Sequence, residues 1–204
     1  MSSKKIIFVL DPMCSWCWGF APVVKAFRNS ATERDRVSLV MGGLRTSGDM
    51  VWDQKAKNYL RQQWDQVAHR TGQPFSDSLF DRKTFVYDTY PACKAVVSVR
   101  ELFGIDSAFA YFHTIQAAFY LQGQDTSNFT VLQELLDSLQ LNRHKFEGFF
   151  HSERAEVLMR HDFAKARSMG ANAFPSVVTI DEAGHMVCQK GYRNIENLKK
   201  TAGI

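Results

Sequence analysis

The fold of this chain is indicated by residues 6–20, whose sequence is IIFVLDPMCSWCWGF. Residues 4–10 form a short apolar run rich in β-branched side chains, which predicts a buried strand, and Asp11-Pro12 predicts the turn that ends it. From Cys14 to Phe27 the apolar residues recur at helical spacing, so a helix follows the turn. The pattern places Cys14 where a strand passes into a helix.

A second strand is predicted at residues 36–41, and Gly42-Gly43 closes it. With the first strand and the helix it forms a β-α-β unit, which is normally parallel and right-handed. This unit occupies residues 1–45.

The spacing of apolar residues becomes helical after this unit. From about residue 49 to 170, long helical patterns are interrupted by glycine and proline, and we expect about six helices there. Strand patterns return at residues 174–180 and 185–190, separated by a turn at 181–184, which predicts an antiparallel hairpin. A closing helix is predicted at residues 194–201.

The order of these elements predicts an α/β core interrupted by one large helical insertion. The core consists of residues 1–45 and 171–204, and the all-helical domain consists of residues 46–170. A chain of 204 residues with 45% hydrophobic side chains can bury a substantial interior without disulfides, so we expect it to be ordered almost throughout.

Composition excludes several classes of partner. The net charge is +4 and the pI is near 8.9, but basic and acidic residues are interleaved, so we expect no nucleic-acid partner. The N-terminal apolar run is too short for an export signal, and no stretch reaches the roughly 20 apolar residues of a membrane span. We therefore expect a soluble, cytoplasmic protein with largely reduced thiols.

Four cysteines are too few for a framework of structural disulfides, and a close pair in a reducing compartment indicates redox or metal chemistry. Zinc requires four ligands, but Cys93 and Cys188 stand alone and the histidines lack metal-binding spacing, so we expect no metal. We interpret Cys93 and Cys188 as small buried apolar residues. The candidate redox pair is Cys14 and Cys17.

Each cysteine of the pair has a chemical role that follows from its position. A thiol at the start of a helix faces unpaired N–H groups and the positive end of the helix dipole, so Cys14 is the expected nucleophile. Cys17 lies one turn further on and can attack a mixed disulfide at Cys14, which makes it the resolving thiol. No cation separates them, and Trp16 offers an aromatic face to an unfolded substrate.

Residues 11–20 resemble the active-site segment of the DsbA-like thioredoxin-fold proteins, especially the FrnE-like subfamily of predicted protein-disulfide isomerases. The resemblance spans the whole chain and implies a thioredoxin-like core with a helical insertion. Pro22 matches the position where such proteins kink the active-site helix.

The resemblance also assigns a role to Pro175, where the superfamily carries a cis-proline that faces the cysteine pair. It implies that the backbone of Phe174 pairs with an extended substrate strand. The substrate surface would then include Trp16, Trp18 and Phe174.

One position departs from the family. Thioredoxin and DsbA carry a buried acid six residues before the first cysteine, where this chain has Phe8. Asp11 is close in sequence and could accept the proton of Cys17 instead. The alternative interpretation is that Asp11-Pro12 is simply a turn that ends the strand.

The expected function is that of a thiol–disulfide oxidoreductase acting on protein or peptide thiols and disulfides, and the direction of exchange stays open. We expect no cofactor, with glutathione as a candidate reductant or co-substrate. Two alternatives remain: a glutathione-dependent enzyme similar to kappa-class transferases or 2-hydroxychromene-2-carboxylate isomerase, and a redox-sensing binding protein. The oligomeric state is left open.

Overall fold

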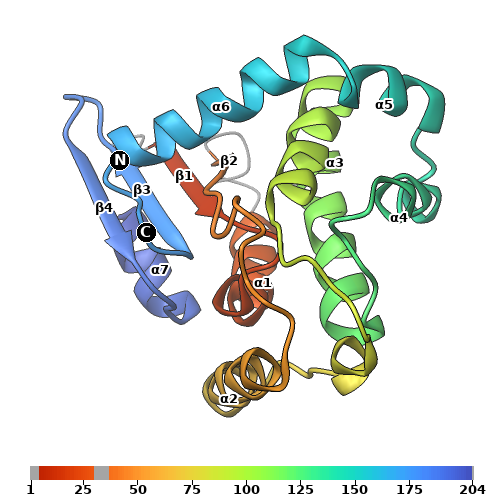
Figure 1. The fold of residues 1–204 in the computed structure, drawn as a ribbon. Coiled ribbons are helices and arrows are strands. Elements are labelled where there is room, and N and C mark those ends of the chain that lie inside the picture. Colours follow the sequence, from red (N-terminus) through yellow and green to blue (C-terminus); the bar gives the residue numbers. More distant parts are fainter. Residues whose placement is uncertain (1–4, 30–36, 204) are drawn as a thin grey trace.

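The computed structural model describes residues 5–29 and 37–203, in which four strands form a single mixed sheet (Figure 1). The strand order is β2-β1-β3-β4. Strand β1 is parallel to β2, while β3 is antiparallel to both β1 and β4. The bounds of these strands are Lys5–Leu10 for β1, Val37–Met41 for β2, Ser176–Ile180 for β3 and Met186–Lys190 for β4.

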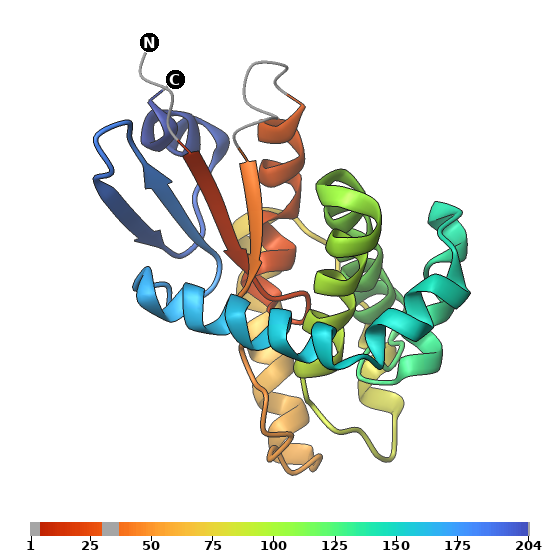
Figure 2. The same ribbon diagram turned by 90° about the horizontal axis from the view of Figure 1, so that it is seen from above.

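Helices cover both faces of the sheet (Figures 1 and 2). On one face lie α1 (Ser15–Arg28) and α7 (Ile195–Ala202), and on the other lies α6 (Glu153–Ser168). Strand β1 is therefore buried from Ile6 to Leu10 and has no polar face. Its alternate side chains enter two separate apolar clusters, one toward α1 and α7 and one toward α6.

The helical region between β2 and β3 packs directly on this core. Helices α3 and α6 both contact β2, and α2 contacts α1. Arg100 of α3 pairs with the buried Asp162 of α6 at 2.8 Å, and the same carboxylate accepts the Met41 N–H of β2 at 2.9 Å. The bounds of its helices are Gln54–Thr71 for α2, Tyr90–Gln122 for α3, Phe129–Glu134 for α4 and Arg143–Phe150 for α5.

The predicted elements are confirmed with small differences at their ends. The β-α-β unit is parallel and the late hairpin is antiparallel. Helix α3 is divided at Gly104, whose φ of 86° breaks the helix, and short 3₁₀ helices lie at Asp77–Asp81 and Asp137–Leu139. The first residues of the two N-terminal predicted strands, Lys4 and Arg36, lie outside the described residues. The predicted domain limits stay a prediction.

Helix α1 follows the predicted pattern closely. Its apolar residues at helical spacing, among them Phe20, Val24 and Phe27, are buried against β1, and Pro22 lies within the helix. Nowhere in residues 5–29 and 37–203 is a helix both long and apolar enough to cross a membrane. The fold thus presents the first turn of α1 at the end of β1.

Candidate active site

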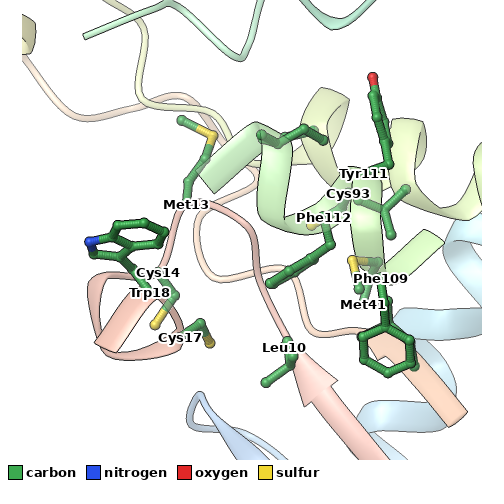
Figure 3. Close-up of a cluster of buried hydrophobic side chains, with 14 of the residues drawn as sticks. Leu10, Met13, Cys14, Cys17, Trp18, Met41, Cys93, Phe109, Tyr111 and Phe112 are labelled. Atoms are coloured by element: carbon green, nitrogen blue, oxygen red, sulfur yellow. The ribbon is translucent and has the colours of Figure 1, made fainter. Parts of the chain in front are cut away.

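Cys14 and Cys17 lie together at the start of α1 (Figure 3). Cys14 is the N-cap residue, with extended backbone, and its N–H donates to the Asp11 carbonyl at 3.2 Å while its own carbonyl accepts the Trp18 N–H at 3.0 Å. Each of the four cysteines, all within the described residues, is a free thiol.

Both thiols of the pair are buried, with Cys14 4% and Cys17 1% exposed, but their partners differ. Cys17 is almost fully buried, and this burial, followed by the hydrogen bond with Cys14, raises the pKa of the Cys17 thiol well above its usual range. The nearby charge of Asp11 adds to the increase. Cys17 is thus held as a thiol and needs a proton acceptor before it can attack a disulfide.

Cys14 faces the segment before β3. Its Sγ donates to the Phe174 carbonyl at 3.5 Å, and the side chain does not cap the helix. The Phe174-Pro175 peptide bond is cis, as the resemblance implies. A Cβ on Gly42 would lie 2.1 Å from the Phe174 ring, so glycine at position 42 provides the space for that ring beside the end of β2.

Asp11 lies at the end of β1 and is completely buried. Its Oδ1 accepts the Met13 N–H at 2.8 Å, and its Oδ2 accepts the Leu44 N–H at 2.7 Å and the Cys93 thiol at 3.4 Å. Burial raises the pKa of Asp11 above its usual range, although these hydrogen bonds oppose the increase. Asp11 therefore closes the turn after β1 and also forms a buried acid next to the pair.

Residues of the helical region hold the active-site turn from the other side. The Tyr87 hydroxyl donates to the Met13 carbonyl at 2.6 Å, immediately before Cys14. The Trp18 indole N–H donates to the Pro74 carbonyl at 2.8 Å, and the Gln73 amide donates to the Trp18 carbonyl at 2.9 Å. Sequence patterns do not reveal these contacts, because each joins residues more than 50 positions apart.

The predicted substrate-contact residues lie in different environments. Trp16 is half-buried, with its ring centroid 6.3 Å from that of Tyr192, and Phe174 is half-buried beside Cys14. Trp18 is buried and stacks on Tyr120 at 5.8 Å (Figure 3 shows its ring beside the cysteines). Its position joins α1 to the helical region and gives no support to a substrate contact.

The remaining cysteines differ from each other. Cys93 is completely buried, as predicted, but it is also a hydrogen-bond donor to Asp11, which the sequence does not indicate. Cys188 is only half-buried on β4, so the prediction that it is a buried residue is wrong, because β4 is the edge strand of the sheet. Across the part of the chain that the structure describes, no group of three or more His, Cys, Asp or Glu side chains could hold a metal ion.

A cysteine pair at the start of the helix that follows β1, opposite a cis-proline that precedes β3, defines the thioredoxin-like class of folds. A family model described as thioredoxin matches residues 7–200, so the chain belongs to the thioredoxin family.

Similar structures support a narrower group. A candidate protein disulfide isomerase from Nitrosomonas europaea is 30% identical, with a TM-score of 0.82 over 97% of this chain and 95% of that one. The cytosolic disulfide reductase DsbM from Pseudomonas aeruginosa is 24% identical, with a TM-score of 0.72 over 91% of this chain and 88% of that one. DsbM has also been solved with GSH. These similarities confirm the DsbA-like thioredoxin fold with its helical insertion.

A curated relative has a different kind of name. The ClpXP adapter protein SpxH of Bacillus subtilis (strain 168) is 21% identical over 174 residues, which cover 85% of this chain and 57% of the relative. The chain therefore spans little more than half the length of the curated relatives it matches.

Proposed function

We propose that this protein is a thiol–disulfide oxidoreductase that reduces or isomerises disulfides through Cys14 and Cys17. The hydrogen bond from Cys14 Sγ to the Phe174 carbonyl carries this proposal, because it brings the nucleophile to the segment where an extended substrate would bind. The substrates would be protein or peptide disulfides, and the compartment would be the cytoplasm, as in the name of the DsbM reductase.

The proposed reaction has two exchange steps. In the first, the Cys14 thiolate attacks one sulfur of a substrate disulfide, forms a mixed disulfide and expels the other sulfur as a thiolate. In the second, Cys17 gives its proton to a base and attacks the Cys14 sulfur, which releases the second substrate thiol. The substrate gains two electrons and the pair becomes a disulfide, which an external thiol reductant must reduce.

Asp11 is the proposed base for the second step. It is the buried carboxylate whose charge acts on Cys17, and the high pKa of Cys17 makes proton removal necessary. Asp11 would thus replace the family's upstream acid, whose position is occupied by the apolar Phe8 of the core.

Substrate contact would involve the half-buried Trp16 and the Phe174 backbone. When both cysteines are thiols, the Cys14 thiol donates a hydrogen bond to the Phe174 carbonyl. Once Cys14 loses its proton or forms a mixed disulfide, it has no hydrogen to donate, and the carbonyl becomes available to a substrate N–H. Substrate binding and the first exchange step would therefore favour one another.

The proposed activity can be tested by reduction of a peptide disulfide in the presence of glutathione. Cys14→Ser should abolish reduction, and Cys17→Ser should accumulate a mixed disulfide at Cys14 that mass spectrometry detects. Cys188→Ser, which alters a half-buried thiol on β4, is the control and should react at the wild-type rate. Full activity of Cys17→Ser would contradict a dithiol mechanism and favour glutathione as the working thiol.

Glutathione is proposed as the reductant, without any bound cofactor. The observation that supports this is the structure of DsbM with GSH. The oxidised protein can be incubated with glutathione or with a thioredoxin-type dithiol, and the reaction quenched with acid. If the dithiol reduces the Cys14–Cys17 disulfide and glutathione leaves it intact, this assignment is wrong.

A second candidate function is protein binding controlled by the redox state of the pair, which the name of the SpxH relatives favours. A Cys14→Ser variant that captures no mixed disulfide, yet still binds a stable protein partner with wild-type affinity, would support this function in place of the first.

A further inference from the structure

The buried carboxylate of Asp11 collects donors from three separate segments of the chain. Met13 donates from the active-site turn, Leu44 from the loop after β2, and Thr89 and Cys93 from the start of α3. Each of these donors within the described residues is neutral. Hydrogen bonds from neutral donors therefore oppose the burial penalty of the ionised carboxylate, and each of them lowers its proton affinity.

The groups around this carboxylate come from every element packed against it. The titratable and charged groups are Cys17 on α1, with Cys14 beside it, Cys93 and Tyr120 on α3, Tyr87 in the segment before α3, and Arg45 next to Tyr87. The two tyrosines keep their protons because burial raises the pKa of each phenol. Cys93 is the titratable member of this group whose side chain donates directly to Asp11.

We propose that Cys93 is a positioning residue for the resolving step: its thiol holds the carboxylate of Asp11 ionised and oriented to take the proton of Cys17. This inference depends on the proposed function, since it concerns the second exchange step of that reaction. The bond that Cys93 contributes is one that a serine could also make and an alanine could not.

The surroundings of Cys93 suit this role and exclude a third exchange step. Cys93 is completely buried, and burial together with the charge of Asp11 raises its pKa well above the usual range. The thiol is therefore unreactive and serves only as a donor. Its backbone N–H donates to the Thr89 carbonyl at 3.0 Å, and Thr89 is itself held by the Arg45 backbone at 2.7 Å, so the donor is held in place.

A two-phase exchange assay separates the steps. Dithiobis-nitrobenzoate, added below one equivalent to a Cys188→Ser background, releases one coloured thiolate when Cys14 attacks and a second when Cys17 resolves. The second phase should slow as the pH falls and Asp11 takes up a proton. Without the Cys93 donor the pKa of Asp11 increases. Cys93→Ala should therefore move the acid-side decrease of the second-phase rate to higher pH, and at a fixed pH within that decrease the rate should fall about two- to threefold, because a thiol is a weak donor.

The matched variant is Cys93→Ser, which retains a donor. In Cys93→Ser the second-phase rate should fall at the same pH as in the wild type or at a lower pH. The rate of the first phase should be unchanged in both variants. A Cys93→Ala profile that coincides with the wild-type profile overturns the proposal. Loss of the second phase in the Cys188→Ser background itself would instead overturn the proposed dithiol function. If Cys93→Ala does not fold, Thr89→Val removes another donor to the same carboxylate and should shift the acid-side decrease in the same direction.

Discussion

Removal of the Tyr87 hydroxyl tests whether the helical region positions the nucleophile. The hydroxyl donates to the Met13 carbonyl at 2.6 Å, and both residues are buried. Tyr87→Phe keeps the ring and leaves the carbonyl without a partner, which costs about 1–3 kcal/mol. At roughly 2–4 °C per kcal/mol for a chain of this size, the melting temperature should fall by several degrees.

Tyr111→Phe is a close control for this change. The Tyr111 hydroxyl donates to the Leu132 carbonyl at 2.6 Å and is equally buried, but the bond joins α3 to α4. The two variants should therefore lose similar stability. Because the Met13 carbonyl belongs to the peptide that leads into Cys14, Tyr87→Phe should in addition slow attack by Cys14 about three- to tenfold.

The assay measures thermal unfolding and the first phase of exchange with a chromogenic disulfide, at temperatures where both variants are folded. The two variants can be compared over a wide range of pH. Burial raises the pKa of both tyrosines, so their hydroxyls stay protonated and continue to donate. Equal first-phase rates in the two variants would show that Tyr87 acts only through stability and does not position Cys14.

Two further changes test the buried charges. Asp11→Asn should leave the first phase of exchange intact and slow the second at least tenfold at neutral pH. Burial raises the pKa of Asp11 above its ordinary 3.8, so the ionised carboxylate destabilises the folded state. As the pH falls through the raised pKa, the free energy of unfolding of the wild type should therefore increase relative to that of Asp11→Asn. Denaturant titrations of both proteins across this pH range measure the difference. Arg100→Leu leaves the buried Asp162 uncompensated and should cost about 3–5 kcal/mol of unfolding free energy, and recovery in the double variant with Asp162→Asn would confirm the pairing.

Much of the fold could be predicted from local patterns. The continuous apolar run from Ile6 to Leu10 predicts a strand covered on both faces, and α1 and α6 provide that cover. The two strand-like sequence patterns after residue 170, separated by a turn, predict the hairpin of β3 and β4. These features depend on neighbours a few residues apart, so the sequence shows them directly.

The candidate site was predictable in part. The spacing of Cys14 and Cys17 at a strand-to-helix junction identifies the pair, and a family resemblance adds Pro175. The local sequence does not determine the burial of Trp18, because an aromatic residue beside the motif can face either the solvent or the core. Its burial depends on Pro74 and Tyr120, which the insertion brings next to α1.

The short motif of Cys14 and Cys17 is thus determined by the sequence alone, because a helix start and a two-residue spacing are local properties. The environment of Asp11 is decided only by the tertiary structure. Its carboxylate meets Leu44 and Cys93, which lie 33 and 82 positions away, and the depth of burial comes from helices that pack over it. Proton affinity depends on such desolvation and on distant donors, and no local pattern encodes either one.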